Sequence, residues 1–140
     1  MNLTEGAMIR LLLPVDGSET SARAVQMVAD CYPRLAPLRV WLLHVRITDS
    51  MPRSAFDERS LQIAKRALES AEAVFLHVGV PCISEVKDGY VPSVIVQHAR
   101  SANCDGIVMG TRGMGSTGEV MGSIARQVIA LADIPVTLVK

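Results

Sequence analysis

The chain has 140 residues, of which 49% are apolar and 20% charged, and its 14 basic and 14 acidic residues give a net charge of zero. This is the size and mix of one ordinary globular domain, so we expect residues 1–140 to fold as a single domain. A zero balance and few aromatic residues argue against a general nucleic-acid binder, which needs surplus cations for phosphates and rings for stacking.

Two further features bear on the cellular compartment. No apolar run has the length that a bilayer span requires, and the first residues lack the basic and apolar segments of a secretion signal. We therefore expect a cytoplasmic protein that does not bind membranes. The three cysteines, Cys31, Cys82 and Cys104, are far apart and lie among apolar residues. This pattern predicts buried, reduced thiols rather than a metal or redox site.

Five short apolar runs predict β-strands. Residues 9–15 and 40–45 are almost continuously hydrophobic, as strands buried on both faces are. Residues 83–86 alternate more, which suits a strand nearer a sheet edge. Residues 106–109 and 135–139 complete the set.

Four amphipathic stretches between these runs predict helices, because apolar residues recur in them at intervals of three and four. The first begins near Ser18. The second covers residues 61–78 and ends at Gly79, where glycine adopts a left-handed backbone easily. Pro92 fits the first turn of the third helix, and the fourth covers residues 124–131. Residues 46 to about 55 predict a surface loop.

This alternation of strands and helices predicts an α/β fold. Parallel strands joined by right-handed crossovers form one open sheet, and the helices cover both of its faces. In such a sheet, ligands bind at the carboxyl ends of the strands where the winding direction reverses. The search for a site therefore narrows to a few loops.

The segment 110–123, after the fourth strand, holds five glycines in fourteen residues. Glycine lets successive N–H groups approach one anion, and Gly122-Ser123 opens a helix whose N-terminus favours phosphate. The alternative is a flexible surface loop. Neither the dinucleotide fingerprint, which belongs to a first strand, nor a Walker A loop, in which Ser116 would replace the lysine, fits this context.

A second candidate, Asp16, follows the first strand. Its carboxylate could accept a hydrogen bond from an adenine amino group or a ribose hydroxyl, or take part in metal binding near phosphates. Alternatively it caps the first helix, with Glu19 completing a capping box. Its expected position beside the glycine-rich segment favours a ligand-binding role.

The remaining polar residues form no catalytic pattern. No nucleophile–base pair, paired carboxylates or metal-ligand cluster is visible, so we predict no catalytic residues and no protein metal ligands. Arg112 either meets a phosphate or is a solvated loop residue, whereas Arg46 and Asp49 are expected to face water. The histidines share no spacing and are interpreted as hydrogen-bonded structural residues: His44, His77 and His98.

Residues 9–21, 42–45, 106–113 and 134–139 together resemble the universal stress protein family, and the similarity covers essentially the whole chain. The resemblance implies a five-stranded parallel sheet of order 3-2-1-4-5, like that of the adenine-nucleotide alpha-hydrolases. It implies ATP or AMP as ligand, Mg²⁺ accompanying ATP, and a homodimer formed through the last strand. By similarity, the ligand-binding residues are Pro14, Val15, Asp16, Val45, Met109, Gly110, Arg112, Gly113, Gly122, Ser123 and Ile124.

The resemblance also implies roles for these positions. Asp16 and Val45 address adenine, Gly110 lies by the ribose, and the phosphates are held by Gly113, Gly122, Ser123 and Ile124. The family pattern is Gly-x2-Gly-x9-Gly-Ser/Thr, whereas Gly113 and Gly122 enclose eight residues. Either the loop is one residue shorter, or the register holds and Ser123 replaces the glycine.

Three functions follow from these observations. The first is a regulatory stress-response protein that binds an adenine nucleotide. The second is a slow ATP hydrolase that uses the same site with a divalent metal. The third is a dimeric interaction module that has lost the nucleotide. The sequence favours the first, because no general base, catalytic lysine or arginine clamp can be identified.

Overall fold

Strands and helices alternate along the protein. The computed structural model describes residues 8–47, 53–113 and 121–140, and for residues 53–57 it describes the backbone alone. The strands are β1 (Ile9–Pro14), β2 (Leu38–Arg46), β3 (Cys82–Asp88), β4 (Gly106–Gly110) and β5 (Val136–Val139). The helices are α1 (Glu19–Cys31), η1 (Tyr32–Arg34, a 3₁₀ turn), α2 (Arg53–His77), α3 (Val91–Ser101) and α4 (Ser123–Leu131).

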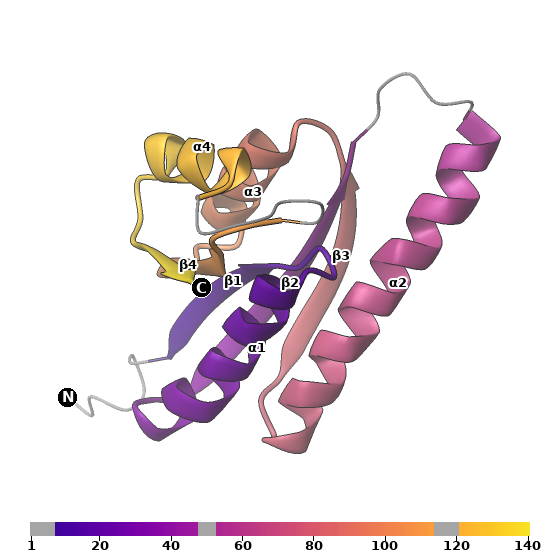
Figure 1. Cartoon of the computed structure of the whole chain (residues 1–140). Helices are drawn as coiled ribbons and strands as arrows, with labels where there is room; N and C mark the ends of the chain where they lie inside the picture. The colour runs from indigo at the N-terminus through magenta and orange to yellow at the C-terminus, as the bar shows by residue number, and fades with distance from the viewer. Residues whose placement is uncertain (1–7, 48–52, 114–120) are drawn as a thin grey trace.

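The described strands form one parallel sheet in the order β3-β2-β1-β4-β5, which confirms the predicted α/β fold (Figure 1). The chain winds outward from β1 to β3, returns to the other side of β1, and continues to β5. The winding direction therefore reverses between β1 and β4. Strand β3 lies at an edge, as its alternating sequence predicts.

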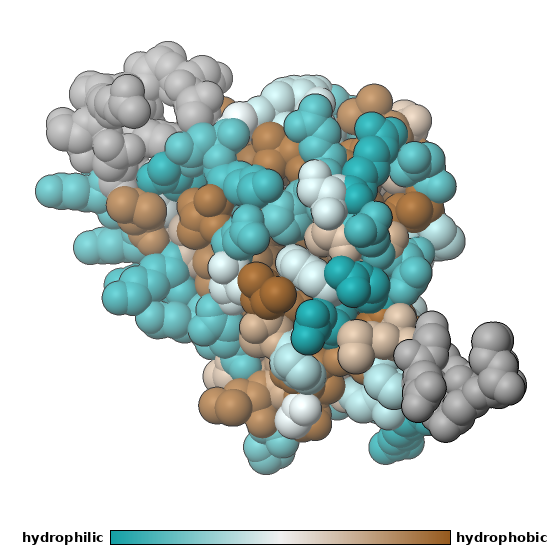
Figure 2. All heavy atoms as spheres, turned by 180° about the vertical axis from the view of Figure 1, so that it is seen from behind, coloured by the Kyte–Doolittle hydropathy of each residue, from teal (hydrophilic) through white to brown (hydrophobic). Residues whose placement is uncertain are grey.

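Helices cover both faces of this sheet and define two hydrophobic cores. Figure 1 shows α1 and α2 on one side and α3 and α4 on the other. Leu11, Leu13 and Leu42 pack with α1 and α2, while Leu12 and Trp41 point to the opposite core with α3 and α4. The period-two alternation of side chains along a strand produces this division. On the molecular face in Figure 2, apolar side chains are interspersed with hydrophilic ones.

The helix boundaries decide between the two roles considered for Asp16 and correct the predicted start of the second helix. Ser18, not Asp16, is the N-cap of α1, and its hydroxyl accepts a hydrogen bond of 3.2 Å from the Ser21 N–H. The alternative in which Asp16 caps this helix and forms a capping box with Glu19 is therefore excluded, and the predicted start near Ser18 is confirmed. Helix α2 begins at Arg53 rather than at residue 61, so the connection after β2 is shorter than predicted. Gly79 has the expected left-handed backbone, with φ of 71°.

The cysteines differ from one another in exposure. Cys104 is buried and Cys82 partly buried, but Cys31 is exposed at the end of α1. The prediction of three buried thiols is thus wrong for Cys31. Burial raises the pKa of Cys104 to about 11 and, with the nearby charge of Glu72, raises the pKa of Cys82.

None of the helices in the described part of the chain is both long and apolar enough to cross a membrane.

Candidate functional site

A cavity of about 720 Å³ lies at the carboxyl ends of β1, β2 and β4, where the winding of the sheet reverses. Its walls come from the loops after these strands, the first turn of α4, and parts of α2 and α3. Every ligand-binding position expected from the sequence lies on this wall: Pro14, Val15, Asp16, Val45, Met109, Gly110, Arg112, Gly113, Gly122, Ser123 and Ile124. Segments distant in sequence are therefore brought to one site.

Asp16 lies in a turn that leads from β1 into α1. One carboxylate oxygen, Oδ1, accepts a hydrogen bond of 2.9 Å from the Ser18 N–H, and the Asp16 N–H donates to the Ser21 hydroxyl at 3.3 Å. These contacts fix the side chain beside the helix start without making it the cap. The second oxygen, Oδ2, lies 2.9 Å from the place that a Cβ atom on Gly113 would occupy. The loops after β1 and β4 thus touch across the pocket.

The first turn of α1 holds the backbone of Arg112. The Thr20 hydroxyl donates to the Arg112 carbonyl oxygen at 2.5 Å, and the Ser18 hydroxyl donates to the same oxygen at 3.3 Å. The Arg112 N–H donates back to the Thr20 oxygen at 3.4 Å. Thr20 is only 3% exposed, and these hydrogen bonds are partly buried. They fix the start of the glycine-rich segment relative to α1.

Gly110 allows β4 and α1 to approach closely. A Cβ atom on Gly110 would stand 2.3 Å from the Thr20 Oγ1 and 2.8 Å from the Ser21 nitrogen. Real Cβ atoms do not show such contacts, so only glycine fits here without a backbone shift. Gly110 lines the pocket, and its lack of a side chain is required by helix packing.

The two ends of the glycine-rich segment meet at Gly122. Its N–H donates to the Thr111 carbonyl oxygen at 2.7 Å, and it is the N-cap residue of α4. Because the first N–H groups of a helix have no acceptor within the helix, the start of α4 directs such donors and a positive dipole end toward the pocket. Ser123 is the first residue of this helix. The glycines between the two ends, Gly115 and Gly118, lie outside the described residues.

The histidines have different surroundings. The His44 Nδ1 forms a hydrogen bond of 2.8 Å with the Val15 carbonyl oxygen, which confirms His44 as a satisfied structural residue joining β2 to β1. His77 is exposed. His98 is 5% exposed, and neither ring nitrogen has a hydrogen-bond partner among the described residues. The prediction of a satisfied histidine is therefore wrong for His98.

The region around His98 contains two charges on β3. Its Nδ1 lies 3.8 Å from the Glu85 carboxylate, a distance at which no hydrogen bond forms. Burial and the Lys87 charge lower the pKa of His98, and Glu85 opposes them. This imidazole therefore favours its neutral form more strongly than a free histidine does.

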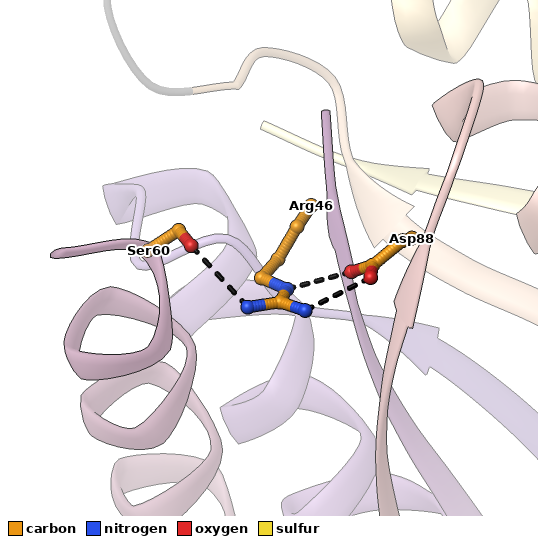
Figure 3. Close-up of polar contacts among 3 residues, drawn as sticks. All are labelled: Arg46, Ser60 and Asp88. Carbon is orange, nitrogen blue, oxygen red and sulfur yellow. Dashed lines mark hydrogen bonds and ion pairs between the residues drawn. The ribbon is translucent and has the colours of Figure 1, made fainter. Parts of the chain in front are cut away.

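Arg46 connects three elements at the rim of the pocket (Figure 3). Its guanidinium meets both carboxylate oxygens of Asp88 on β3, at 2.6 and 2.9 Å, and the Ser60 hydroxyl on α2 at 3.4 Å. The Arg46 side chain is 13% exposed, so the expectation that it faces water is wrong. Two aligned N–H···O bonds to one carboxylate make this a rigid pair. Asp49 lies outside the described residues.

Helix α2 supplies a wall that sequence reasoning missed: Arg59, Ser60 and Ile63 all line the pocket. No motif identifies these residues, because a helix face reaches the site only after the chain has turned back over β2. Their one sequence signal is spacing, since positions 59 and 63 lie on the same helix face.

Across residues 8–47, 53–113 and 121–140, no group of three or more metal-binding side chains lies close enough together to hold an ion.

A model of the universal stress protein family matches residues 8–140. The chain belongs to this family. A universal stress protein from Thermus aquaticus is 34% identical over 137 residues, which cover 93% of this chain and 97% of the relative. Another, from Synechocystis, is 33% identical over 132 residues, which cover 92% of this chain and 83% of the relative. These proteins support the family assignment made from sequence segments.

Solved structures show the same fold. The universal stress protein UspA from Lactobacillus plantarum superposes with a TM-score of 0.82 at 20% identity, covering 94% of this chain and 97% of that one. The universal stress protein from Archaeoglobus fulgidus in complex with dAMP gives 0.74 at 24% identity, with coverages of 95% and 98%. An Arabidopsis thaliana family member with AMP bound gives 0.73 at 22% identity, with coverages of 94% and 91%.

Proposed function

We propose that this pocket binds an adenine nucleotide, ATP or AMP, and that binding regulates a cytoplasmic stress-response protein. The observation that carries the proposal is the convergence of the loops after β1 and β4 with the start of α4 on one cavity. Family members from Archaeoglobus fulgidus and Arabidopsis thaliana have been solved with dAMP and AMP, which supports an adenine nucleotide as the class of ligand.

The two ends of the pocket differ in chemistry, and this suggests an orientation. Val45 and Met109 offer apolar surface near the ends of β2 and β4. A purine base prefers such surface. Asp16, at the end of the central strand β1, would accept a hydrogen bond from an amino or hydroxyl group of the ligand. The pocket is also lined by Gly113 and the N-terminus of α4, whose N–H groups and dipole favour phosphate.

The position of Gly122 bears on the length of the glycine-rich segment. A Cβ atom on Gly122 would lie 3.3 Å from the Thr111 carbonyl oxygen, so the close approach is made by Gly122 itself. Ser123 follows as a helical residue. This supports the alternative in which the segment is one residue shorter than the family pattern.

Mg²⁺ would enter with ATP rather than occupy a site of the free protein. Asp16 is the one carboxylate among the described residues that line the pocket. Mg²⁺ commonly takes one or two carboxylates plus phosphate oxygens and waters, so the residues present fit a metal held mainly by the nucleotide. When bound, the metal would neutralise phosphate charge, while Asp16 would orient the ligand at the β1 end.

Isothermal titration calorimetry with ATP, AMP and adenosine, with and without Mg²⁺, tests the proposal. We expect one site per chain with a dissociation constant on the order of micromolar for ATP and weaker binding of adenosine, because phosphate contacts are lost. Absent or millimolar binding of all three ligands would favour the interaction-module hypothesis. A long incubation analysed for ADP separates a binding protein from a slow hydrolase.

We also propose a homodimer formed through β5. At the opposite edge, β3 carries Glu85, Lys87 and Asp88, charges that discourage edge pairing. Strand β5 has the uncharged sequence VTLV and pairs, among the described strands, with β4 alone. Sedimentation velocity should show a dimer at tens of micromolar, roughly the range in which weak contacts form. Thr137→Lys should convert it to a monomer, and a monomeric parent protein would refute the proposal.

A further inference from the structure

The α2 wall contains a cation with no described partner. Arg59 is exposed and lines the pocket, and it forms no hydrogen bond or ion pair with any residue in the described part of the chain. Two other arginines line the pocket, and both form hydrogen bonds. The Arg46 guanidinium is bound to Asp88, and the backbone of Arg112 is held by Thr20. Arg59 therefore has a guanidinium available for a ligand.

The location of Arg59 indicates which part of a ligand it meets. On the pocket wall it belongs with Val45, Ile47 and Ile63, at the ends of β2 and α2. The glycine-rich segment and α4 lie across β1, on the β4 side of the sheet. If the phosphates of a bound nucleotide reach α4, the base is the part of the nucleotide that lies toward Arg59.

We propose that Arg59 contacts the base of the bound nucleotide and contributes to its recognition; this inference rests on the proposed function. A guanidinium is planar and stacks on the face of a nucleobase, where the positive charge and the π-system attract each other. The neighbouring Ile47 and Ile63 supply apolar surface on which the edge of the ring can rest. Such a contact favours the large face of a purine over a pyrimidine.

The Arg46–Asp88–Ser60 cluster positions Arg59. Ser60 is the next residue of α2, and its hydroxyl is held by the Arg46 guanidinium. The same guanidinium is fixed by both oxygens of Asp88 (Figure 3). The turn of α2 that carries Arg59 is thereby tied to the ends of β2 and β3. In this view Asp88 is a positioning residue that acts on the ligand through Arg59.

Calorimetry with adenosine, AMP and ATP tests the base contact, using Arg59→Gln and the control Arg66→Gln. Arg66 lies on α2 seven positions further, is exposed, and does not line the pocket. We expect Arg59→Gln to weaken binding about fivefold for all three ligands alike, the effect of losing one cation–π contact. Arg59→Lys keeps the positive charge but loses the planar guanidinium, so its affinity should lie between those of the parent protein and Arg59→Gln. Arg66→Gln should bind the ligands as the parent protein does.

The pattern across the ligands decides between outcomes. A loss that grows from adenosine to ATP would place Arg59 on the phosphates and overturn the proposal, as would a loss within twofold for every ligand. If the parent protein binds none of the ligands, the proposed function itself fails. Thermal melting of each variant checks that this exposed substitution leaves the fold intact.

A double-mutant cycle tests the positioning role. Asp88→Asn removes the charge that fixes Arg46, and we expect it to weaken all three ligands about twofold to threefold. In an Arg59→Gln background the same change should have no further effect, because Asp88 acts through Arg59. A purely structural role for Asp88 would give additive losses, and that result would overturn the positioning role.

Discussion

The Thr20 hydroxyl donates a 2.5 Å hydrogen bond to the Arg112 carbonyl oxygen and accepts one from the Arg112 N–H, so one buried side chain joins α1 to the loop after β4. The two residues are 92 positions apart in the sequence. Thr20→Val keeps the shape of the side chain but removes both hydrogen bonds. We expect the free energy of unfolding to fall by about 1–2 kcal/mol, since the partly buried Arg112 N–H and carbonyl oxygen lose this partner.

Urea denaturation followed by the fluorescence of Trp41, the single tryptophan, measures this change. Ser70→Ala, which removes an exposed hydroxyl on α2, is the control and should shift stability by less than about 0.5 kcal/mol. A Thr20→Val protein as stable as the parent would show that the loop is held by other contacts.

Gly113 and Asp16 give a prediction about binding. A Cβ atom on Gly113 would lie 2.9 Å from the Asp16 Oδ2, an atom at the end of a side chain that can rotate. Gly113→Val should therefore fold but displace Asp16 and fill the approach to the phosphates, weakening ATP binding at least about thirtyfold. Arg112→Ala leaves the backbone N–H groups in place and should cost less. Calorimetry measures both, and equal losses would contradict a backbone cradle.

Gly110 gives a prediction about stability. A Cβ atom there would meet the backbone of α1 at Ser21, which cannot rotate away. Gly110→Ala should therefore lower the free energy of unfolding by about 2–3 kcal/mol through overpacking. Gly106→Ala is the matched control on the same strand, because its nearest neighbours lie at 3.4 and 3.5 Å, an ordinary contact distance. Urea unfolding should show less than about 1 kcal/mol for this control; equal losses would refute the close-approach explanation.

His98 makes stability depend on pH. Its pKa is lower in the folded protein than the ordinary 6.5, so unfolding takes up a proton as the pH falls through and below that value. The contribution of the neutral ring is complete above about pH 6.5 and is lost on acidification. One such group gives a slope of at most about 1.4 kcal/mol per pH unit.

The variant His98→Leu should flatten this dependence. It also removes two buried nitrogens that lack hydrogen-bond partners among the described residues, so at pH 7.5 it should be at least as stable as the parent. Unfolding free energies at pH 7.5, 6.5 and 5.5 provide the comparison. Identical pH slopes for the two proteins would exclude His98 as the group responsible.

Alkylation should distinguish the three cysteines. In the folded protein at pH 8, iodoacetamide should label the exposed Cys31 first and Cys82 more slowly, because Cys82 is partly buried and its pKa is raised. Cys104, buried and with a pKa of about 11, should react only after unfolding in urea. Peptide mass spectrometry reads each site. Early labelling of Cys104 would show that its surroundings open readily.

The spacing of hydrophobic residues was sufficient to predict the order of strands and helices. Continuous apolar runs and amphipathic stretches are local properties of the sequence. Pro92 lies in the first turn of α3, as its missing N–H predicts. The start of α1 near Ser18 was predicted, but a capping role for Asp16 stayed open. Asp16 and Ser18 are both capping residue types two positions apart, and only backbone geometry separates them. The start of α2 was predicted too late, because residues 53–60 lack the clear apolar stripe that indicates a helix.

The residues of the candidate site also divide into those that the sequence could predict and those that it could not. The positions on the strand ends follow from the family resemblance, since parallel strands bring their carboxyl ends to one edge. Arg59 and the Arg46–Ser60 contact depend on how α2 packs over β2, and no local pattern encodes that packing. His98 is buried on α3, and its missing hydrogen-bond partner could be found only from the three-dimensional arrangement.

The pocket wall begins at Pro14 and ends at Ala125, so it draws on nearly the whole length of the chain. During synthesis, β1, β2 and β3 are made before Gly122 and the start of α4. A ligand of this pocket stabilises only the state in which both sides are present. It cannot assist early folding of the nascent chain, and its binding distinguishes a completed sheet from a partly folded one.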